Sequence, residues 1–186
     1  GTLLIAGAAP SVIEDLAKAR SLRPDALVMA INGAGQVIED IDFLLCGHAE
    51  KAQMFYDARL KKFPNSKPFT VHATFRDRYR EGKPIASCVT HVWKGVATGG
   101  TSAWVAARIG KAMGFAERIL CGCPLEATGY VAGESDGIGH DCARIGSGEG
   151  RMDGKYRATF EKRAREEGAG VFSMSGWSQT LLGAPC

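Results

Sequence analysis

The sequence lacks the features that mark several specialised classes of protein. No apolar run approaches the roughly 20 residues that a membrane-spanning helix needs. The apolar run that begins at Thr2 has no basic segment before it, so we expect no signal peptide and a cytoplasmic protein. The net charge of +3 is too small to predict nucleic-acid binding by itself.

The six cysteines do not follow the spacing of common metal-binding or redox motifs. One residue separates Cys121 from Cys123, whereas zinc knuckles and redox motifs usually have two. A zinc site that also includes His140 and Cys142 is one interpretation. Free thiols in a reducing compartment are the simpler one, and we expect neither a metal nor a cofactor.

What the sequence does contain is typical of one folded domain. It has 186 residues, of which 45% are hydrophobic and 23% charged. It shows no internal repeat and no linker that would separate two domains. We therefore expect a single domain over residues 1–186.

Short apolar runs alternate with segments of helical periodicity. This alternation predicts a single Rossmann-like α/β domain, in which helices cover both faces of a mostly parallel sheet. The expected strands are 3–6, 26–31, 42–46, 69–73, 85–93, 118–121 and 171–174. The expected helices are 12–22, 49–63, 101–113, 153–167 and 178–182.

The ends of the expected strands carry small and hydrogen-bonding residues. Ligands of open parallel sheets bind outside the carboxyl ends of the strands. This composition suits a pocket in which the backbone approaches a nucleotide closely, so we assign binding roles to the strand-end residues. They are Gly7, Pro10, Ser11, Asn32, Gly33 and Gly122.

A glycine turn followed by an amphipathic helix stands out at residues 98–113. Gly100 allows close backbone approach, and either Thr101 or Ser102 can cap the helix. The free N–H groups at such a helix start favour a phosphate or another anion. An ordinary loop, helix and strand without a ligand would have the same pattern.

The segment 129–150 contains seven glycines and no hydrophobic period, which indicates a loop or lid over the pocket. It includes His140, a candidate general base whose alternative is an exposed loop histidine. His48, after an expected strand, is a second candidate for the catalytic group. Its alternative role is to cap the helix that follows.

Several of these motifs together resemble a bacterial sialyltransferase family that uses CMP-sialic acid. Gly7-Ala-Ala-Pro-Ser11 resembles its first strand-end turn, and Asn32 matches an asparagine after its second strand. Thr101-Ser102, with the helix and strand up to Gly122, matches a further block. The pattern is similar to that of motility-accessory glycosyltransferases, hydroxymethylpterin pyrophosphokinase-like proteins and short phage proteins.

The resemblance implies roles for individual residues. The turn from Gly7 to Ser11 would face the nucleotide, and Asn32 would hydrogen-bond its base or sugar. Thr101 and Ser102 would contact ribose or phosphate. Tyr130 resembles the loop tyrosines that hold the leaving phosphate in that family.

The sequence also departs from the family pattern in three places. Ala8 stands where the family has an asparagine, and Gly122-Cys-Pro124 lacks the family's carboxylate. No histidine precedes the last long helix, where 149–153 occupies the place of the family's base. These departures put CMP-sialic acid in doubt as the donor.

Three functions follow from these patterns. The first is a nucleotide-sugar-dependent glycosyltransferase that acts on a hydroxyl of a glycan or of a phage-type modified DNA base. The second is a pyrophosphokinase-like enzyme, which would need Mg²⁺ at carboxylates. The third is a non-catalytic phage binding or assembly protein, and association into a homo-oligomer stays open. The candidate carboxylates are Asp42, Asp136, Asp141 and Asp153.

Overall fold

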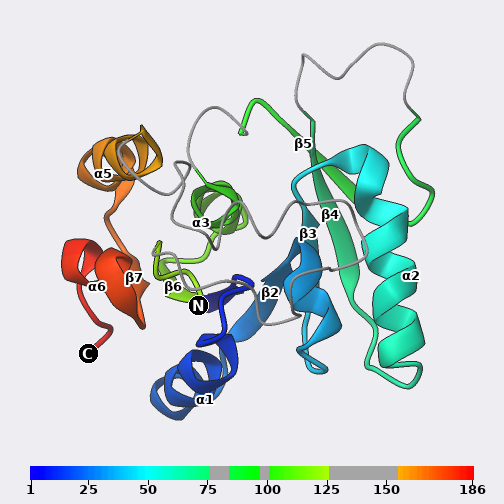
Figure 1. Ribbon diagram of the computed structural model, residues 1–186, viewed down its shortest axis with the longest axis horizontal. Coiled ribbons are helices and arrows are strands. Elements are labelled where there is room, and N and C mark those ends of the chain that lie inside the picture. Colours follow the sequence, from blue (N-terminus) through cyan, green and yellow to red (C-terminus); the bar gives the residue numbers. More distant parts are fainter. Residues whose placement is uncertain (76–83, 97–100, 126–154) are drawn as a thin grey trace.

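A seven-stranded sheet forms the centre of the protein (Figure 1). The computed structural model describes residues 1–75, 84–96, 101–125 and 155–186. All neighbouring strands are parallel and lie in the order β5-β4-β3-β2-β1-β6-β7. The strands are β1 Thr2–Ala6, β2 Leu27–Ile31, β3 Phe43–Cys46, β4 Thr70–Phe75, β5 His91–Lys94, β6 Glu117–Cys121 and β7 Val171–Ser173.

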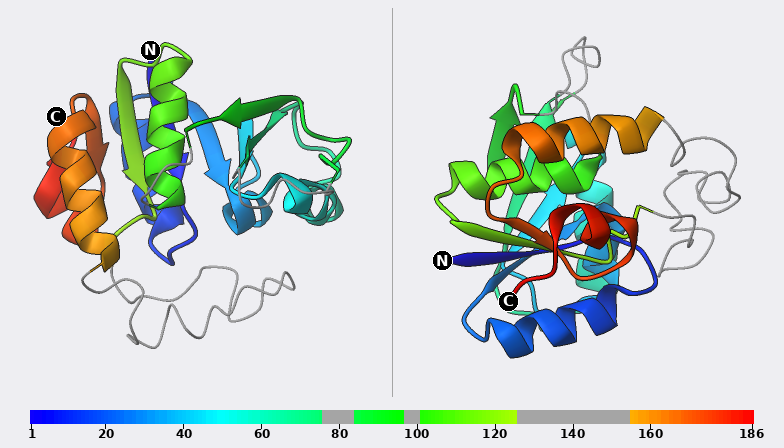
Figure 2. Two further views of the ribbon diagram at one scale, coloured as in Figure 1. Left: turned by 90° about the horizontal axis from the view of Figure 1, so that it is seen from above. Right: turned by 90° about the vertical axis from the view of Figure 1, so that its left-hand side faces the viewer.

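Helices cover both faces of this sheet, which confirms the predicted α/β class (Figure 2). Side chains of α1 and α2 pack on one face, and side chains of α3 and α5 pack on the other. The helices are α1 Val12–Leu22, α2 Ala52–Lys62, α3 Ser102–Ala112, α5 Lys155–Glu167 and α6 Gly176–Leu182, with the short 3-10 helices η1 Asn32–Gln36 and η2 Ala49–Lys51. No helix in the described ranges is long and apolar enough to cross a membrane.

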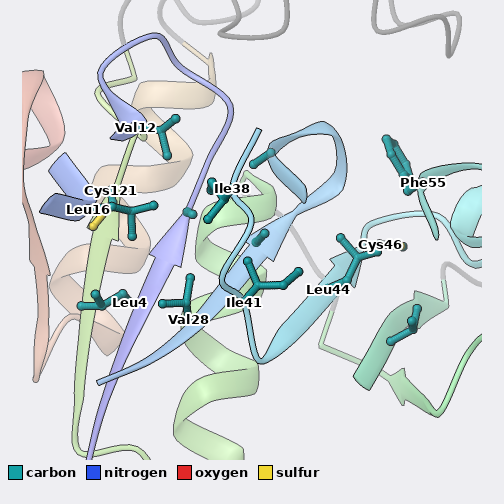
Figure 3. Close-up of a cluster of buried hydrophobic side chains, with 14 of the residues drawn as sticks. Leu4, Val12, Leu16, Val28, Ile38, Ile41, Leu44, Cys46, Phe55 and Cys121 are labelled. Carbon is teal, nitrogen blue, oxygen red and sulfur yellow. The ribbon is translucent and has the colours of Figure 1, made fainter. Parts of the chain in front are cut away.

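The central strands are apolar throughout because both of their faces are buried. In β1, Leu4 packs into the cluster beneath α1 and α2, whereas Leu3 and Ile5 pack beneath α3. Figure 3 shows the first of these clusters, in which Leu4 lies beside Val28 and Leu16. Alternate residues of each strand therefore attach helices to opposite faces.

The fifth expected strand is shorter than its sequence suggests. Residues 85–93 were expected to be extended, but β5 begins only at His91. The chain turns before it, and the N–H of Val89 donates to the carbonyl of Ala86. This turn prevents residues 86–89 from pairing with β4.

Because all neighbouring strands are parallel, their carboxyl ends lie along one edge of the sheet, here called the carboxyl edge. β1 lies beside β6, although a long stretch of chain separates them in the sequence. From β1 the chain continues to β2 on one side, and from β6 to β7 on the other. The β1–β6 boundary is therefore the topological switch point, where ligands of such sheets commonly bind.

Candidate functional site

Three elements that are distant in the sequence meet at Gly47 on the carboxyl edge. The side-chain Oδ1 of Asn32, after β2, accepts a hydrogen bond from the Gly47 N–H at 2.9 Å. A Cβ atom at Gly47 would lie 3.5 Å from Ser102 Oγ, at the start of α3. We call Asn32, Gly47, Thr74 and Ser102 the Gly47 cradle. It brings together two residues that the sequence analysis selected, Asn32 and Ser102.

Asn32 holds an unusual backbone conformation in this cradle. Its φ is +49°, in the left-handed region, which residues other than glycine seldom adopt. Asparagine tolerates this region better than most side chains do. The bond from Gly47 to Asn32 Oδ1 helps to hold the conformation, so the turn after β2 has a fixed shape.

Thr74 also binds Gly47, a role that no sequence pattern indicated. Its side chain is only 2% exposed, and its hydroxyl donates to the Gly47 carbonyl at 3.0 Å. The N–H and the C=O of Gly47 are thus both bound by side chains of neighbouring strand ends. The backbone of Gly47 cannot rotate freely, and its Cα keeps a defined position.

The start of α3 supplies the remaining part of the cradle. Thr101 is the N-cap, and its Oγ1 accepts from the Trp104 N–H at 3.4 Å, so Thr101 takes the capping role that the sequence left open. Ser102 is the first helical residue. Among the described residues, the Ser102 hydroxyl and the Asn32 Nδ2 group have no hydrogen-bond partner, which leaves both able to donate to a ligand.

A second polar cluster closes the β1–β6 switch point. The buried carboxylate of Asp15 accepts three hydrogen bonds at Oδ2, from the Gly122 N–H at 2.8 Å, Ser175 Oγ at 2.6 Å and Ser11 Oγ at 3.1 Å. These donors follow or adjoin the ends of β1, β6 and β7. The predicted residues Ser11 and Gly122 are therefore brought together, but they bind a carboxylate of the chain itself.

The backbone is also closely packed at the same boundary between β1 and β6. A Cβ atom at Gly7 would lie 2.5 Å from both Cys123 Sγ and the Gly122 carbonyl oxygen. The Gly7 N–H donates to the Cys121 carbonyl at 2.8 Å. Gly7 thus allows the ends of β1 and β6 to approach each other, and Gly122 leaves room for Val12 of α1, so packing explains both glycines without a ligand.

His48 directly follows Gly47 and occupies the N-cap position of η2. Its side chain does not cap that helix, so the capping alternative is wrong. Its Nδ1 instead lies 3.4 Å from Glu50 Oε1. A carboxylate beside an imidazole can orient the ring and stabilise its protonated form, which is what a general base requires of its neighbour.

The other predicted site residues are scattered or lie outside the described ranges. Pro10 is exposed, and Gly33 is buried within η1. Gly100, Tyr130 and His140 lie outside the described residues, as does the predicted lid 129–150. Their assigned roles stay predictions.

The proposed metal ligands do not come together in the described structure. Cys121 packs beneath α1 and Cys123 beneath α3, and His140 and Cys142 lie outside the described residues, so the zinc interpretation stays untested. Burial also raises the pKa of Cys123 to about 12. Asp42 precedes β3, on the opposite edge, where it binds the Val28 N–H and Lys67. Within the described ranges, no three such side chains form a metal-binding group.

A buried arginine supports the turn that carries Asn32. The Arg59 side chain is fully buried and donates to the carbonyls of Gly35, Ile38 and Glu39 at 2.7, 2.6 and 2.5 Å. Burial lowers its pKa. Sequence periodicity placed Arg59 on a helix but could not show that its charge would face three carbonyl groups.

Comparison with known proteins shows a likeness of fold. The chain matches a substituted variant of the sialyltransferase CST-II in complex with CMP, with a TM-score of 0.68 and 12% sequence identity. The match covers 99% of this chain and 86% of the sialyltransferase. No family model and no curated protein sequence matches the chain. The sheet and its helices thus have the arrangement of a sialyltransferase, although the two sequences have little in common.

Proposed function

We propose that the protein is a glycosyltransferase that binds a nucleotide-sugar donor at the carboxyl edge of its sheet. One observation carries this proposal: nearly the whole chain shares the fold of a sialyltransferase whose structure contains CMP. The Gly47 cradle supports it, because its unpartnered donors lie at the edge where parallel sheets bind ligands.

The cradle has the chemistry that a nucleotide needs. Ser102 Oγ and Asn32 Nδ2 can donate to ribose or phosphate oxygens. Ser102 also begins an eleven-residue helix, whose first N–H groups and dipole favour negative charge. A leaving nucleotide phosphate at this position would gain stabilisation as its charge develops.

The transfer itself needs a base in addition to this binding site. The acceptor hydroxyl attacks the anomeric carbon, the bond from that carbon to the phosphate oxygen breaks, and a base takes the hydroxyl proton. His48 is our first candidate because it follows Gly47 and has Glu50 beside it. His140 is the second candidate, and the acceptor is a hydroxyl of a glycan or a modified DNA base.

We expect the donor to differ from CMP-sialic acid. Ala8 cannot make the contact that an asparagine would make, and Pro124, which stands in the place of the family's carboxylate, has no ionisable side chain. Both differences lie at the switch point, which Asp15 and its partners already fill. A donor recognised mainly through the Gly47 cradle is consistent with this arrangement.

Calorimetry with a panel of nucleotides tests the proposal. We expect CMP or another nucleotide to bind the wild-type protein at millimolar concentration or below. Donor cleavage is then measured with the nucleotide sugars of the base that binds best. Binding without any cleavage would favour the non-catalytic alternative, and no binding by any nucleotide would overturn the proposal.

A further inference from the structure

We propose that the missing side chain of Gly47 determines whether the nucleotide can bind. This inference rests on the proposed function and adds a residue to which neither the strand-end motifs nor the fold comparison assigns a role. Gly47 presents its bare Cα between the Asn32 amide and the Ser102 hydroxyl. An oxygen-rich part of the nucleotide, ribose or phosphate, occupies the place that a side chain would take.

Backbone conformation does not explain a glycine at this position. Among the glycines that the structure describes, six have a positive φ, where a side chain would cause strain, but Gly47 is not one of them. Any L-residue can adopt the conformation that Gly47 has. The reason for a glycine must therefore lie in the space around its Cα.

Close packing within the protein does not explain it either. A Cβ atom at Gly47 would lie 3.5 Å from Ser102 Oγ and 3.7 Å from both side-chain end atoms of Asn32, which are ordinary van der Waals distances. At Gly7 and Gly122, by contrast, a Cβ would meet neighbouring atoms at 2.5 Å. The fold therefore requires glycine at those two positions and has room for alanine at Gly47.

The neighbours of that space are hydrogen-bond donors. A methyl group there would stand against Ser102 Oγ and Asn32 Nδ2, the two groups that have no partner among the described residues. It would keep a ligand oxygen from reaching both donors at once. Because Asn32 and Thr74 hold the N–H and C=O of Gly47, the backbone cannot move aside to restore the space.

The test is the Gly47→Ala variant, with Gly1→Ala as its matched control. The control adds the same methyl group at the opposite edge of the sheet, where the new Cβ would lie 3.8 Å from Phe115. We expect both variants to keep the melting temperature of the wild type within about 2 °C, since neither new methyl meets a close contact. Calorimetry with CMP should show affinity reduced about tenfold or more in Gly47→Ala only.

A second ligand identifies which part of the nucleotide lies over Gly47. If Gly47→Ala weakens the binding of cytidine and CMP equally, the ribose occupies the space. If it weakens the binding of CMP alone, the phosphate does.

A stable Gly47→Ala variant with wild-type affinity for both ligands would overturn the inference and leave the proposed function standing. A wild type that binds no nucleotide would overturn both. A Gly47→Ala variant that fails to fold would show that the glycine is structural, which also contradicts the inference.

Discussion

His72 should make the protein markedly less stable in mild acid. It lies in β4 with 3% of its side chain exposed. Its Nδ1 accepts from the indole N–H of Trp93 at 3.0 Å, and its Nε2 lies 3.0 Å from Thr70 Oγ1. Because the indole can only donate, Nδ1 carries no proton, and Nε2–H donates to the threonine. The folded protein therefore holds this ring neutral.

Burial, and then the neighbouring His91, lower the pKa of His72 from 6.5 to about 4. The lowered pKa means that the unfolded chain takes up a proton first as the pH falls. The stability that the neutral ring contributes is complete above pH 6.5 and is lost as the pH falls toward 4. The full loss corresponds to about 3 kcal/mol, of which roughly 2 kcal/mol falls between pH 7 and pH 5.

Urea unfolding of the wild type and of His72→Gln, at pH 7 and pH 5, measures this loss. Glutamine can accept from Trp93 and donate to Thr70 but does not titrate, so the variant should lose roughly 2 kcal/mol less than the wild type over this interval. His91→Gln is the control, because the His91 side chain is exposed, and it should keep most of the wild-type loss. Equal losses in the wild type and His72→Gln would show that His72 is not the group whose protonation destabilises the protein.

Substitutions at four further positions test the structural basis of the site. Ser102→Ala should weaken nucleotide binding by about 1 kcal/mol in calorimetry and leave the melting temperature nearly unchanged, because Thr101 caps the helix; an unaltered affinity would count against the cradle. In urea unfolding, Asn32→Ala should be less stable than Asn32→Gly by about 1 kcal/mol. Both variants lose the hydrogen bond to Gly47, but only alanine is strained at a φ of +49°. A more stable alanine variant would contradict the role of this backbone conformation. Asp15→Ala should cost about 2 kcal/mol or more of unfolding free energy, since the buried Gly122 N–H loses its acceptor, and a neutral result would show that water replaces the carboxylate. Arg59→Met should lower the free energy of unfolding by about 2 kcal/mol or more, because three carbonyls lose their donor. Arg59→Lys should recover only part of this loss. Full recovery by lysine would show that the planar guanidinium is not needed.

Sequence periodicity predicted the elements well where apolar residues alone define them. The expected helix 12–22 has the bounds of α1, because Val12, Leu16 and Ala19 form one buried face. The same periodicity places Asp15 on that face. Its partners could not be predicted, since Gly122 and Ser175 reach it only because β6 and β7 lie beside β1.

Local sequence likewise predicted only part of the candidate site. Asn32 and Ser102 could be selected because they follow a strand and begin a helix, and local sequence contains that information. The importance of Gly47 depends on the return of α3 to the end of β3, and that of Thr74 on the pairing of β4 with β3. Strand order sets these contacts, and no local pattern specifies it.

A crystal structure of the wild-type protein soaked with CMP would show whether a nucleotide binds over Gly47. We predict nucleotide density at the carboxyl edge, with a ribose or phosphate oxygen over the Gly47 Cα and within hydrogen-bonding distance of Ser102 Oγ and Asn32 Nδ2. Density at the opposite edge of the sheet, or at the carboxyl edge without contact to the Gly47 cradle, would contradict the account.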